Sequence, residues 1–404
     1  MKTLQTTATV HLLNGTQKKI AEGHPWVYRT QIEKTSWTDG DAAAPQPGGL
    51  VEVCDYRGRY LGTGFYNPHS MITVRLLSRR HETIDEPLIR GRVREAIAYR
   101  EIFRRSDTDS YRLIFGEADR LPGVIADQFA GTIVLQTLAL GMERWQELIA
   151  ETLVAELKPD NLILQNEEAI RVKENLPQYR RVYCGEDPGR VVIRENGLSL
   201  QIDLAGGQKT GYFLDQKANH AVLRRYSAGK SVLDCFSYLG GFALNAAAGG
   251  AAGVTAVDIS DSAIGLAREN AERNGLADRM TWVTANAFDF LRDAVRRGDR
   301  YDVIVLDPPA FAKSHAAQAA AARGYKEINL SAFRLLPPGG VLATHSCSYH
   351  MPEDLFIATV LEAARDARRT VRILDVRRQD HDHPVLAGYP ESHYLKSLWL
   401  QAVE

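Results

Sequence analysis

Apolar and polar residues alternate in the first part of the chain, which predicts short β-strands. Between residues 49 and 78 apolar positions recur at every second residue, and glycines interrupt the runs as turns do. Asn14-Gly15 has the composition of a type I′ turn and predicts a further hairpin. We therefore expect residues 1–79 to form a small, mostly β domain.

The hydrophobic spacing changes from two residues to a helical period after residue 84. Apolar residues recur at helical spacing over residues 84–106, in a segment rich in arginine. The segment that follows mixes strand-like runs with a helical stretch at residues 143–157. Residues 80–190 are therefore predicted to form a central α+β domain. Beyond it, Asn196-Gly197 separates two alternating runs and predicts another hairpin.

From residue 231 onward, strand-like runs alternate with helical stretches. The strand-like runs occupy residues 231–236, 254–260, 280–285, 301–309, 340–348 and 370–376. Strands that alternate with helices form a parallel sheet with helices on both faces. The last run, residues 393–403, follows a short connection without a helix, so we expect it to enter the sheet antiparallel. Residues 191–404 are thus predicted as a Rossmann-like domain, and the chain as an α/β protein.

The composition of the chain indicates its cellular location and argues against a membrane or metal partner. Apolar residues make up 45% of the 404 residues, and no run approaches the roughly 20 apolar residues that span a bilayer. The N-terminus lacks the apolar segment of a secretory leader. No CxxC pair occurs among the four cysteines, Cys54, Cys184, Cys235 and Cys347, which argues against structural zinc and disulfides. We expect a cytoplasmic protein with no membrane partner and no metal site.

Charge offers weak evidence against a large nucleic-acid surface, because 49 basic residues face 50 acidic ones. A local basic run remains, since residues 90–112 hold seven arginines. On charge alone we interpret this run as a solvated helix face. It becomes a candidate RNA contact only if other features indicate RNA.

The carboxyl ends of the predicted parallel strands carry candidate ligand-binding residues, because ligands bind at that edge of such sheets. The first strand ends with Asp234 before Gly240-Gly241, and the second ends with Asp258, which can accept hydrogen bonds from both ribose hydroxyls of an adenosine. Asn286 follows the third strand and suits a contact to adenine. The D-x-F-x-x-x-G-G form lacks the G-x-G-x-x-G of dinucleotide sites. It resembles motif I of class I S-adenosylmethionine-dependent methyltransferases.

The fourth strand ends with Asp307-Pro308-Pro309, at the same predicted edge. This tripeptide is typical of methyltransferases, although a plain strand-ending turn also uses prolines. Methyltransferases of amino groups place an aromatic residue directly after the prolines. This chain has Ala310 there and Phe311 one position later, which weakens an N-methylation reading without excluding it.

Cys347 lies just past the fifth strand, and this position makes it a candidate nucleophile. Most cysteines are small buried core residues, but this one would face both the methyl donor and a base held by Asp-Pro-Pro. Carbon 5 of a pyrimidine is a poor nucleophile until a thiolate adds to carbon 6 and makes carbon 5 enamine-like. Asp307 would hydrogen-bond N3 of the ring, which favours cytosine over uracil. We therefore predict Cys347 and Asp307 as catalytic residues.

Motifs along the whole chain resemble one known family. They are HPWVYRTQI (24–32), GQKTGYFLDQ (207–216), DPPAF (307–311), THSCS (344–348), DHPVLAGYPE (382–391) and YLKS (394–397). The chain is similar to the PUA-domain-containing class I S-adenosylmethionine-dependent 23S ribosomal RNA (cytosine-5) methyltransferases. The resemblance implies a PUA domain that binds RNA, S-adenosylmethionine as cofactor, 23S ribosomal RNA as partner and Cys347 at the nucleophile position. More distant cytosine-5 enzymes carry a second cysteine in the segment that corresponds to DPPAF, and this chain has none there.

The motif at residues 207–216 adds further candidates. Its Lys209, Thr210, Asp215 and Gln216 either line the cofactor pocket or approach the RNA, unless the segment is only a capped turn. The predicted cofactor-binding residues are Asp234, Phe236, Ser237, Gly240, Asp258, Ile259, Asn286, Ala287, Asp307 and Gln216.

An RNA partner follows from the PUA resemblance, with support from Lys18-Lys19 and the arginine run. Trp26 and Tyr28 either stack on unpaired bases or pack in a domain interface. Three other functions stay open: methylation of an exocyclic amine, methylation of uracil at carbon 5, and a non-catalytic RNA-binding role in ribosome assembly. A homodimer is compatible with the sequence, although no pattern in it argues for one.

Overall fold

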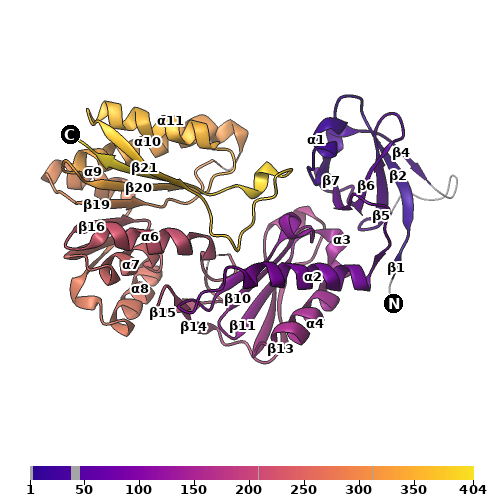
Figure 1. Ribbon diagram of the computed structural model, residues 1–404, viewed down its shortest axis with the longest axis horizontal. Coiled ribbons are helices and arrows are strands. Elements are labelled where there is room, and N and C mark those ends of the chain that lie inside the picture. Colours follow the sequence, from indigo (N-terminus) through magenta and orange to yellow (C-terminus); the bar gives the residue numbers. More distant parts are fainter. Residues whose placement is uncertain (1–2, 38–45, 208, 313) are drawn as a thin grey trace. The chain divides into compact units, whose positions relative to one another are not determined.

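The computed structural model describes residues 3–37, 46–207, 209–312 and 314–404 (Figure 1). The chain divides into two compact units. The N-terminal unit comprises the chain up to Val191 together with His381–Ser392, and the C-terminal unit comprises Val192–Asp380 together with His393–Glu404. A short segment from the C-terminal part of the chain therefore belongs to the N-terminal unit.

The first part of the N-terminal unit is a six-stranded sheet in the spatial order β3-β7-β6-β5-β2-β4. Its strands are β2 (Thr6–Leu12), β3 (Trp26–Tyr28), β4 (Ile32–Trp37), β5 (Leu50–Cys54), β6 (Tyr60–Tyr66) and β7 (Ile72–Ser78). Alternate residues of β2, namely Ala8, Val10 and Leu12, are fully buried, so one face of the sheet forms an apolar core. The predicted mostly β region is confirmed.

The hairpin predicted at Asn14-Gly15 is wrong. Gly15, with φ of +90°, turns the chain into helix α1 (Gln17–Ala21), and β2 pairs with β4 and β5 instead. The turn residues Asn14-Gly15 are compatible with either a strand or a helix after them. Ile20 of α1 is fully buried, and this burial favours the helix.

The second part of the N-terminal unit combines helices with a five-stranded sheet in the order β13-β12-β11-β10-β9. Helix α2 (Glu86–Glu101) begins after Asp85, whose carboxylate accepts a hydrogen bond from the Leu88 N–H at 3.0 Å. The helix ends at Glu101, earlier than the pattern predicted. The other elements are β1 (Thr3–Leu4), β8 (Ile84–Asp85), β9 (Tyr111–Phe115), β10 (Val124–Phe129), β11 (Thr132–Thr137), α3 (Leu140–Glu143), α4 (Gln146–Leu157), β12 (Asn161–Asn166), α5 (Ile170–Lys173) and β13 (Tyr179–Cys184).

Most arginines of the run at residues 90–112 form ion pairs inside this unit. Arg100 donates to both carboxylate oxygens of Asp119 at 2.6 and 2.8 Å. Arg112 donates to both oxygens of Asp127 at 2.5 and 2.8 Å. At the surface, Arg90 pairs with Glu151, Arg94 with Glu156 and Arg104 with Glu101. Carboxylates already neutralise most of the arginines in this run. The run as a whole is therefore neither a solvated helix face nor an RNA contact.

Trp26 packs inside the N-terminal unit. Its indole Nε1 donates to Glu117 at 2.7 Å, and its ring lies 4.9 Å from the ring of Tyr389, in the segment His381–Ser392. Tyr28 makes an edge contact with Trp26 at 6.3 Å. Of the two interpretations of these aromatic residues, the packed interface is the one that the contacts favour.

The segment His381–Ser392 is held by buried polar contacts at both ends. The Asp382 carboxylate accepts the Arg112 N–H at 2.9 Å, and the Asp382 carbonyl accepts from Arg100 at 2.9 Å. Glu391 pairs with His24 at 3.0 Å. These contacts make the segment a structural part of the N-terminal unit.

The C-terminal unit begins within a two-stranded hairpin of β14 (Arg190–Glu195) and β15 (Leu198–Asp203). Asn196 and Gly197 have φ values of +52° and +78°, as a type I′ turn requires. The second predicted hairpin is confirmed.

A seven-stranded sheet in the order β18-β17-β16-β19-β20-β22-β21 forms the centre of this unit. Its strands are β16 (Ser231–Cys235), β17 (Gly253–Asp258), β18 (Met280–Thr284), β19 (Val303–Leu306), β20 (Val341–Ser346), β21 (Val371–Arg377) and β22 (Lys396–Ala402). The strands β16 to β20 are parallel, and β22 runs antiparallel between β20 and β21. The predicted Rossmann-like sheet with an antiparallel last strand is confirmed.

Helices cover both faces of this sheet (Figure 1). Ile304 and Leu306 of β19 pack in a cluster with α9, α10 and α11, whereas Val303 and Val305 pack on the opposite face with α6 and α7. The helices are α6 (Lys217–Ser227), α7 (Gly241–Ala248), α8 (Asp261–Arg273), α9 (Ala287–Arg297), α10 (Gln318–Leu335) and α11 (Glu353–Asp366). Among the described residues, no helix is both long enough and apolar enough to cross a bilayer.

Replacing Arg112 by methionine should leave the fully buried carboxylate of Asp127 without its bidentate partner. We expect the free energy of unfolding to fall by about 3–5 kcal/mol, because a buried charge that loses its partner is strongly destabilising. The control Arg94→Met breaks an exposed pair and should lower it by less than about 1 kcal/mol. Urea unfolding measures both variants, and equal losses would contradict this difference.

Candidate active site

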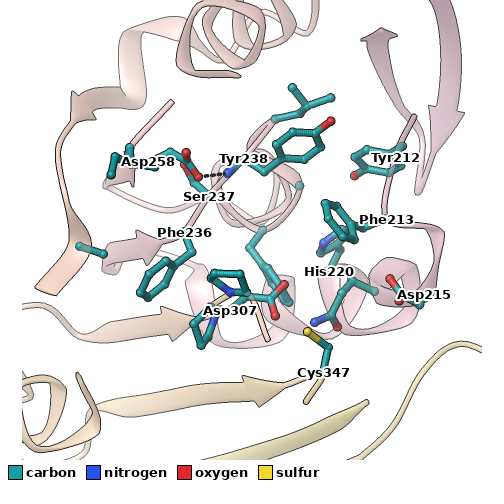
Figure 2. A pocket seen from close by; sticks show the side chains of 18 of the residues that line it. Tyr212, Phe213, Asp215, His220, Phe236, Ser237, Tyr238, Asp258, Asp307 and Cys347 are labelled. Carbon is teal, nitrogen blue, oxygen red and sulfur yellow. Dashed lines mark hydrogen bonds between the residues drawn. The ribbon is translucent and has the colours of Figure 1, made fainter. Parts of the chain in front are cut away.

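The carboxyl ends of the parallel strands open onto a cavity of about 350 Å³ in the C-terminal unit (Figure 2). Most of the predicted site residues line it: Gln216, Phe236, Ser237, Asp258, Ile259, Asn286, Ala287, Asp307 and Cys347. Two predicted cofactor residues do not. Asp234 lies fully buried behind the turn and accepts the Ala243 N–H at 3.0 Å, and Gly240 caps the N-terminus of α7 with φ of +80°.

The turn after β16 is held in an unusual backbone conformation. Phe236 and Tyr238 have φ values of +66° and +48°, which non-glycine residues rarely adopt. The turn is fixed to the neighbouring strand, because Asp258 accepts the Tyr238 N–H at 2.8 Å and the Val257 carbonyl accepts the Phe236 N–H at 2.9 Å (Figure 2). This arrangement holds the Asp258 carboxylate at the wall of the cavity.

Buried carboxyl groups give the cavity its electrostatic character. Burial and, to a smaller extent, the charge of Asp215 raise the pKa of Asp307 to about 7, against the opposing effects of His220, Gln216 and Lys209. Burial and the charge of Asp307 hold the pKa of Asp234 well above its usual range. Carboxyl groups with raised pKa values are stabilised in the ionised form by a nearby cation, so the cavity favours a positively charged ligand.

Two buried polar atoms at the same turn have no hydrogen-bond partner within the described part of the chain. They are the Ser237 hydroxyl and one carboxylate oxygen of Asp234, and both residues are at least nine-tenths buried. Buried polar groups in native proteins are nearly always paired. A polar, cationic ligand fits this turn.

Cys347 follows β20, and its thiol and the Asp307 carboxyl point into the same part of the cavity (Figure 2). Burial raises the pKa of the Cys347 thiol to about 11, and the charge of Asp307 adds to this effect. Lys209 and Lys396 act in the opposite direction. The thiol is therefore protonated at neutral pH, where about half of the Asp307 carboxyl groups are ionised.

A hydrogen-bond network fixes the loop that carries Cys347. The Tyr325 hydroxyl lies 2.9 Å from the hydroxyls of both Ser346 and Ser348. Ser348 also accepts the Ala312 N–H at 3.2 Å, which ties the loop to the segment after Asp307-Pro308-Pro309. The two segments that carry the predicted catalytic residues are therefore joined directly.

Lys396 is a site residue that sequence reasoning missed. The buried Nζ donates to the Ser348 carbonyl at 2.6 Å and to the Tyr394 carbonyl at 2.7 Å. Burial lowers its pKa to about 8. The motif YLKS contained this lysine, but only the antiparallel placement of β22 beside β20 brings it to the nucleophile loop.

His220 and Tyr212 are further lining residues that the sequence did not single out. His220 Nδ1 lies 2.6 Å from a Glu195 oxygen, which connects the hairpin β14–β15 to the cavity. A Cβ atom on Gly241 would lie 2.5 Å from the His220 ring, so this position requires glycine. Lys209 pairs with Asp215 at 3.2 Å, and both line the cavity.

Within the described residues, no group of three or more His, Cys, Asp or Glu side chains is arranged to hold a metal ion.

Comparisons with known proteins agree with this geometry. Residues 176–384 match the family described as S-adenosylmethionine-dependent methyltransferase, and residues 10–79 match a PUA-like domain. A SAM-dependent methyltransferase from Streptococcus mutans has the same fold, with a TM-score of 0.82 at 22% identity over 97% of this chain and 99% of that one. The fold and the site define a class I methyltransferase, and its cofactor is S-adenosylmethionine.

Curated relatives narrow the family. Ribosomal RNA large subunit methyltransferase I of Aeromonas salmonicida is 40% identical over 397 residues, which cover 97% of this chain and 99% of the relative. The protein of the same name from Klebsiella pneumoniae is 41% identical over 390 residues, 95% of this chain and 96% of the relative. The chain belongs to the ribosomal RNA large subunit methyltransferase I family.

The raised pKa of Cys347 predicts slow alkylation by iodoacetamide, which reacts with thiolates. With a pKa of about 11 in place of the ordinary 9.0, the thiolate fraction at pH 8 is about a hundredth of that of an ordinary thiol. The rate should rise about tenfold per pH unit up to about pH 11. Peptide mass spectrometry follows Cys347, with Cys347→Ser as the control, and a rate that levels off near pH 8 would contradict the raised pKa.

Proposed function

We propose that this enzyme methylates carbon 5 of a cytosine in 23S ribosomal RNA, with Cys347 as covalent nucleophile. The observation that carries the proposal is that Cys347 and Asp307 line one cavity with the candidate methyl-donor residues. The names of the relatives support a large-subunit ribosomal RNA substrate, and the PUA-like match supports an RNA-binding part. Such a substrate implies a cytoplasmic enzyme.

The proposed division into domains follows the same logic. Residues 1–79 form the PUA domain, residues 80–190 the central domain and residues 191–404 the methyltransferase domain, of which the segment His381–Ser392 packs in the N-terminal unit. The first two domains bind the RNA that the third methylates. A homodimer stays a prediction.

The cofactor residues are assigned by the chemistry of the groups that line the cavity. Asp258 is positioned to accept the ribose hydroxyls, and Ile259, Asn286 and Ala287 form the adenine side. Ser237 offers its free hydroxyl to the amino-acid end, and the buried Asp234 favours a positive charge beside it. S-adenosylmethionine supplies an electrophilic methyl group on a positively charged sulfur.

Asp307 manages the proton in the proposed reaction. Its carboxylate takes the proton of the Cys347 thiol, and the thiolate then adds to carbon 6 of the cytosine. The displaced electron pair moves through carbon 5 and carbon 4 to N3, which accepts the proton from Asp307. A pKa of about 7 suits a group that must both accept and donate a proton near neutral pH.

Lys396 acts on the nucleophile without touching the base. Its two hydrogen bonds to backbone carbonyls hold the Cys347 loop, and its positive charge lowers the pKa of the thiol. After methyl transfer a base takes the proton from carbon 5, the electron pair of that bond restores the double bond between carbon 5 and carbon 6, and Cys347 leaves as a thiolate. Cys347 is the sole cysteine among the described residues that line the cavity, so a second thiol does not assist this release.

Trapping with RNA that contains 5-fluorocytosine tests the nucleophile, because fluorine at carbon 5 blocks the release step. The wild-type protein should form a stable covalent adduct with such RNA in the presence of S-adenosylmethionine, detected by denaturing gel electrophoresis. Cys347→Ala should lose both the adduct and methylation of normal RNA. The control Cys184→Ala, in the N-terminal unit, should keep both; methylation by Cys347→Ala would exclude the mechanism and favour transfer to an exocyclic amine.

Asp307→Asn should have opposite effects on two measurements. Removing the negative charge lowers the pKa of Cys347, so iodoacetamide alkylation at pH 8 should become faster. Methylation should become at least about a hundredfold slower, because an amide neither takes the thiol proton nor protonates N3. Asp261→Asn removes an equal charge outside the cavity and should change neither rate. If Asp307→Asn methylates normally, Asp307 has no proton-transfer role.

A further inference from the structure

A second cavity of about 350 Å³ lies in the N-terminal unit, and neither Asp307 nor Cys347 lines it. Its walls come from the end of β7, from helix α2 and from Leu386 and Gly388 of the segment His381–Ser392. The wall near Gly388 is tightly closed, because a Cβ atom there would lie 2.5 Å from the Gly23 Cα. The cavity is thus formed where the end of β7, helix α2 and the segment His381–Ser392 meet.

Arginine dominates the polar lining of this cavity. Arg79, Arg80, Arg92 and Arg120 line it together with two carboxylates, Glu82 and Glu117. Glu117 is already engaged, because it accepts from Arg75 at 2.8 Å and from the Trp26 indole at 2.7 Å. The lining therefore carries an excess of positive charge.

Among the three buried arginines of the run at residues 90–112, Arg92 has the longest carboxylate contact, because Arg100 and Arg112 pair at 2.6 and 2.5 Å. Its side chain is only 3% exposed, yet its nearest carboxylate oxygen, on Glu82, lies 3.4 Å away. The guanidinium donates to the Arg120 carbonyl at 2.8 Å, and its Nε has no partner in the described part of the chain. Burial and, to a smaller extent, the charge of Arg120 lower the pKa of Arg92 to about 10, against the opposing effect of Glu82. This buried charge lacks full compensation.

Arg79 and Arg80 also lack a carboxylate partner among the residues that the structure describes. Arg79 donates to the carbonyls of Ile20 and His24, which hold its guanidinium in place but do not neutralise it. Burial lowers the pKa of Arg79 as well. Three arginines with incompletely neutralised charge therefore meet at one cavity, which is the arrangement that an anion with several oxygen acceptors requires.

The rest of the lining is apolar, with Pro25, Leu76, Leu77 and Leu386. Its volume lies within the range of pockets that hold small organic groups. The arginines offer the planar donors that suit a phosphate group, and the apolar wall offers a surface that suits a ribose or a base.

We propose that this cavity binds one nucleotide of the RNA substrate, with its phosphate held by Arg79, Arg80 and Arg92. The inference rests on the proposed function, since it takes RNA as the substrate. The cavity would be an RNA-binding site in the N-terminal unit that contacts the RNA backbone and takes no part in methyl transfer.

Three variants that each remove one positive charge test the site: Arg80→Gln, Arg92→Gln and the matched control Arg94→Gln. Arg94 lies on the same helix as Arg92 but pairs with Glu156 outside the cavity. Binding to in vitro transcribed 23S ribosomal RNA is measured by filter retention over a series of salt concentrations. Arg80→Gln and Arg92→Gln should weaken binding about tenfold and reduce the slope of log K against log salt by about 1. Arg94→Gln should leave both values unchanged.

Methylation kinetics separate failure of this inference from failure of the proposed function. Arg80→Gln and Arg92→Gln should raise the KM for RNA and leave kcat unchanged. If the wild-type protein methylates the RNA but Arg80→Gln binds like wild type, or Arg94→Gln binds as weakly as Arg80→Gln, the anchoring site is wrong and the enzyme assignment stands. If the wild-type protein neither binds nor methylates the RNA, both fail. Arg80 is exposed at the rim, so its variant decides the test even if Arg92→Gln does not fold.

Discussion

Parallel strands that end at one edge of a sheet are the constraint on which the site depends. Residues far apart in the sequence, such as Ser237, Asp258, Asp307 and Cys347, meet because each follows a different parallel strand. Backbone hydrogen bonds fix the spacing of these strands, and helices cover both faces of the sheet, since alternate residues of β19 pack on opposite sides. The antiparallel strand β22 adds Lys396 from a direction that the parallel strands do not supply.

Burial gives this cavity both its affinity for a cation and the low reactivity of its thiol. The same removal from water raises the pKa values of Asp307 and Cys347, to about 7 and about 11. A thiol that stays protonated in the resting protein is protected from stray alkylation and oxidation. In the proposed mechanism it becomes nucleophilic when Asp307 takes its proton, so the carboxyl group that suppresses the thiolate also generates it.

The hydrophobic periodicity of the sequence was enough to predict the parallel sheet and the edge at which its strands end. It failed for features that depend on contacts between distant segments. The β-α alternation after residue 231 was enough to place most cofactor candidates at one edge. Asn14-Gly15 was misjudged because a turn signal does not specify the element that follows, and buried Ile20 favours a helix. The contribution of Lys396 depends on which strand lies beside β20, which no local pattern encodes.

The arginine run shows the same limit for charge. Arg100 and Arg92 lie eight positions apart on α2, yet Arg100 makes a bidentate pair with Asp119, whereas Arg92 has a single contact to Glu82 at 3.4 Å. Counting charges along the sequence does not separate them, because the carboxylate that neutralises each arginine comes from a distant segment. Only the folded structure shows which arginines have a close carboxylate partner and which do not.

The most direct test of the central claim is nucleoside mass spectrometry of 23S ribosomal RNA after incubation with the protein and methyl-labelled S-adenosylmethionine. We expect labelled 5-methylcytidine. Labelled N4-methylcytidine or 5-methyluridine, or no labelled nucleoside, would contradict it.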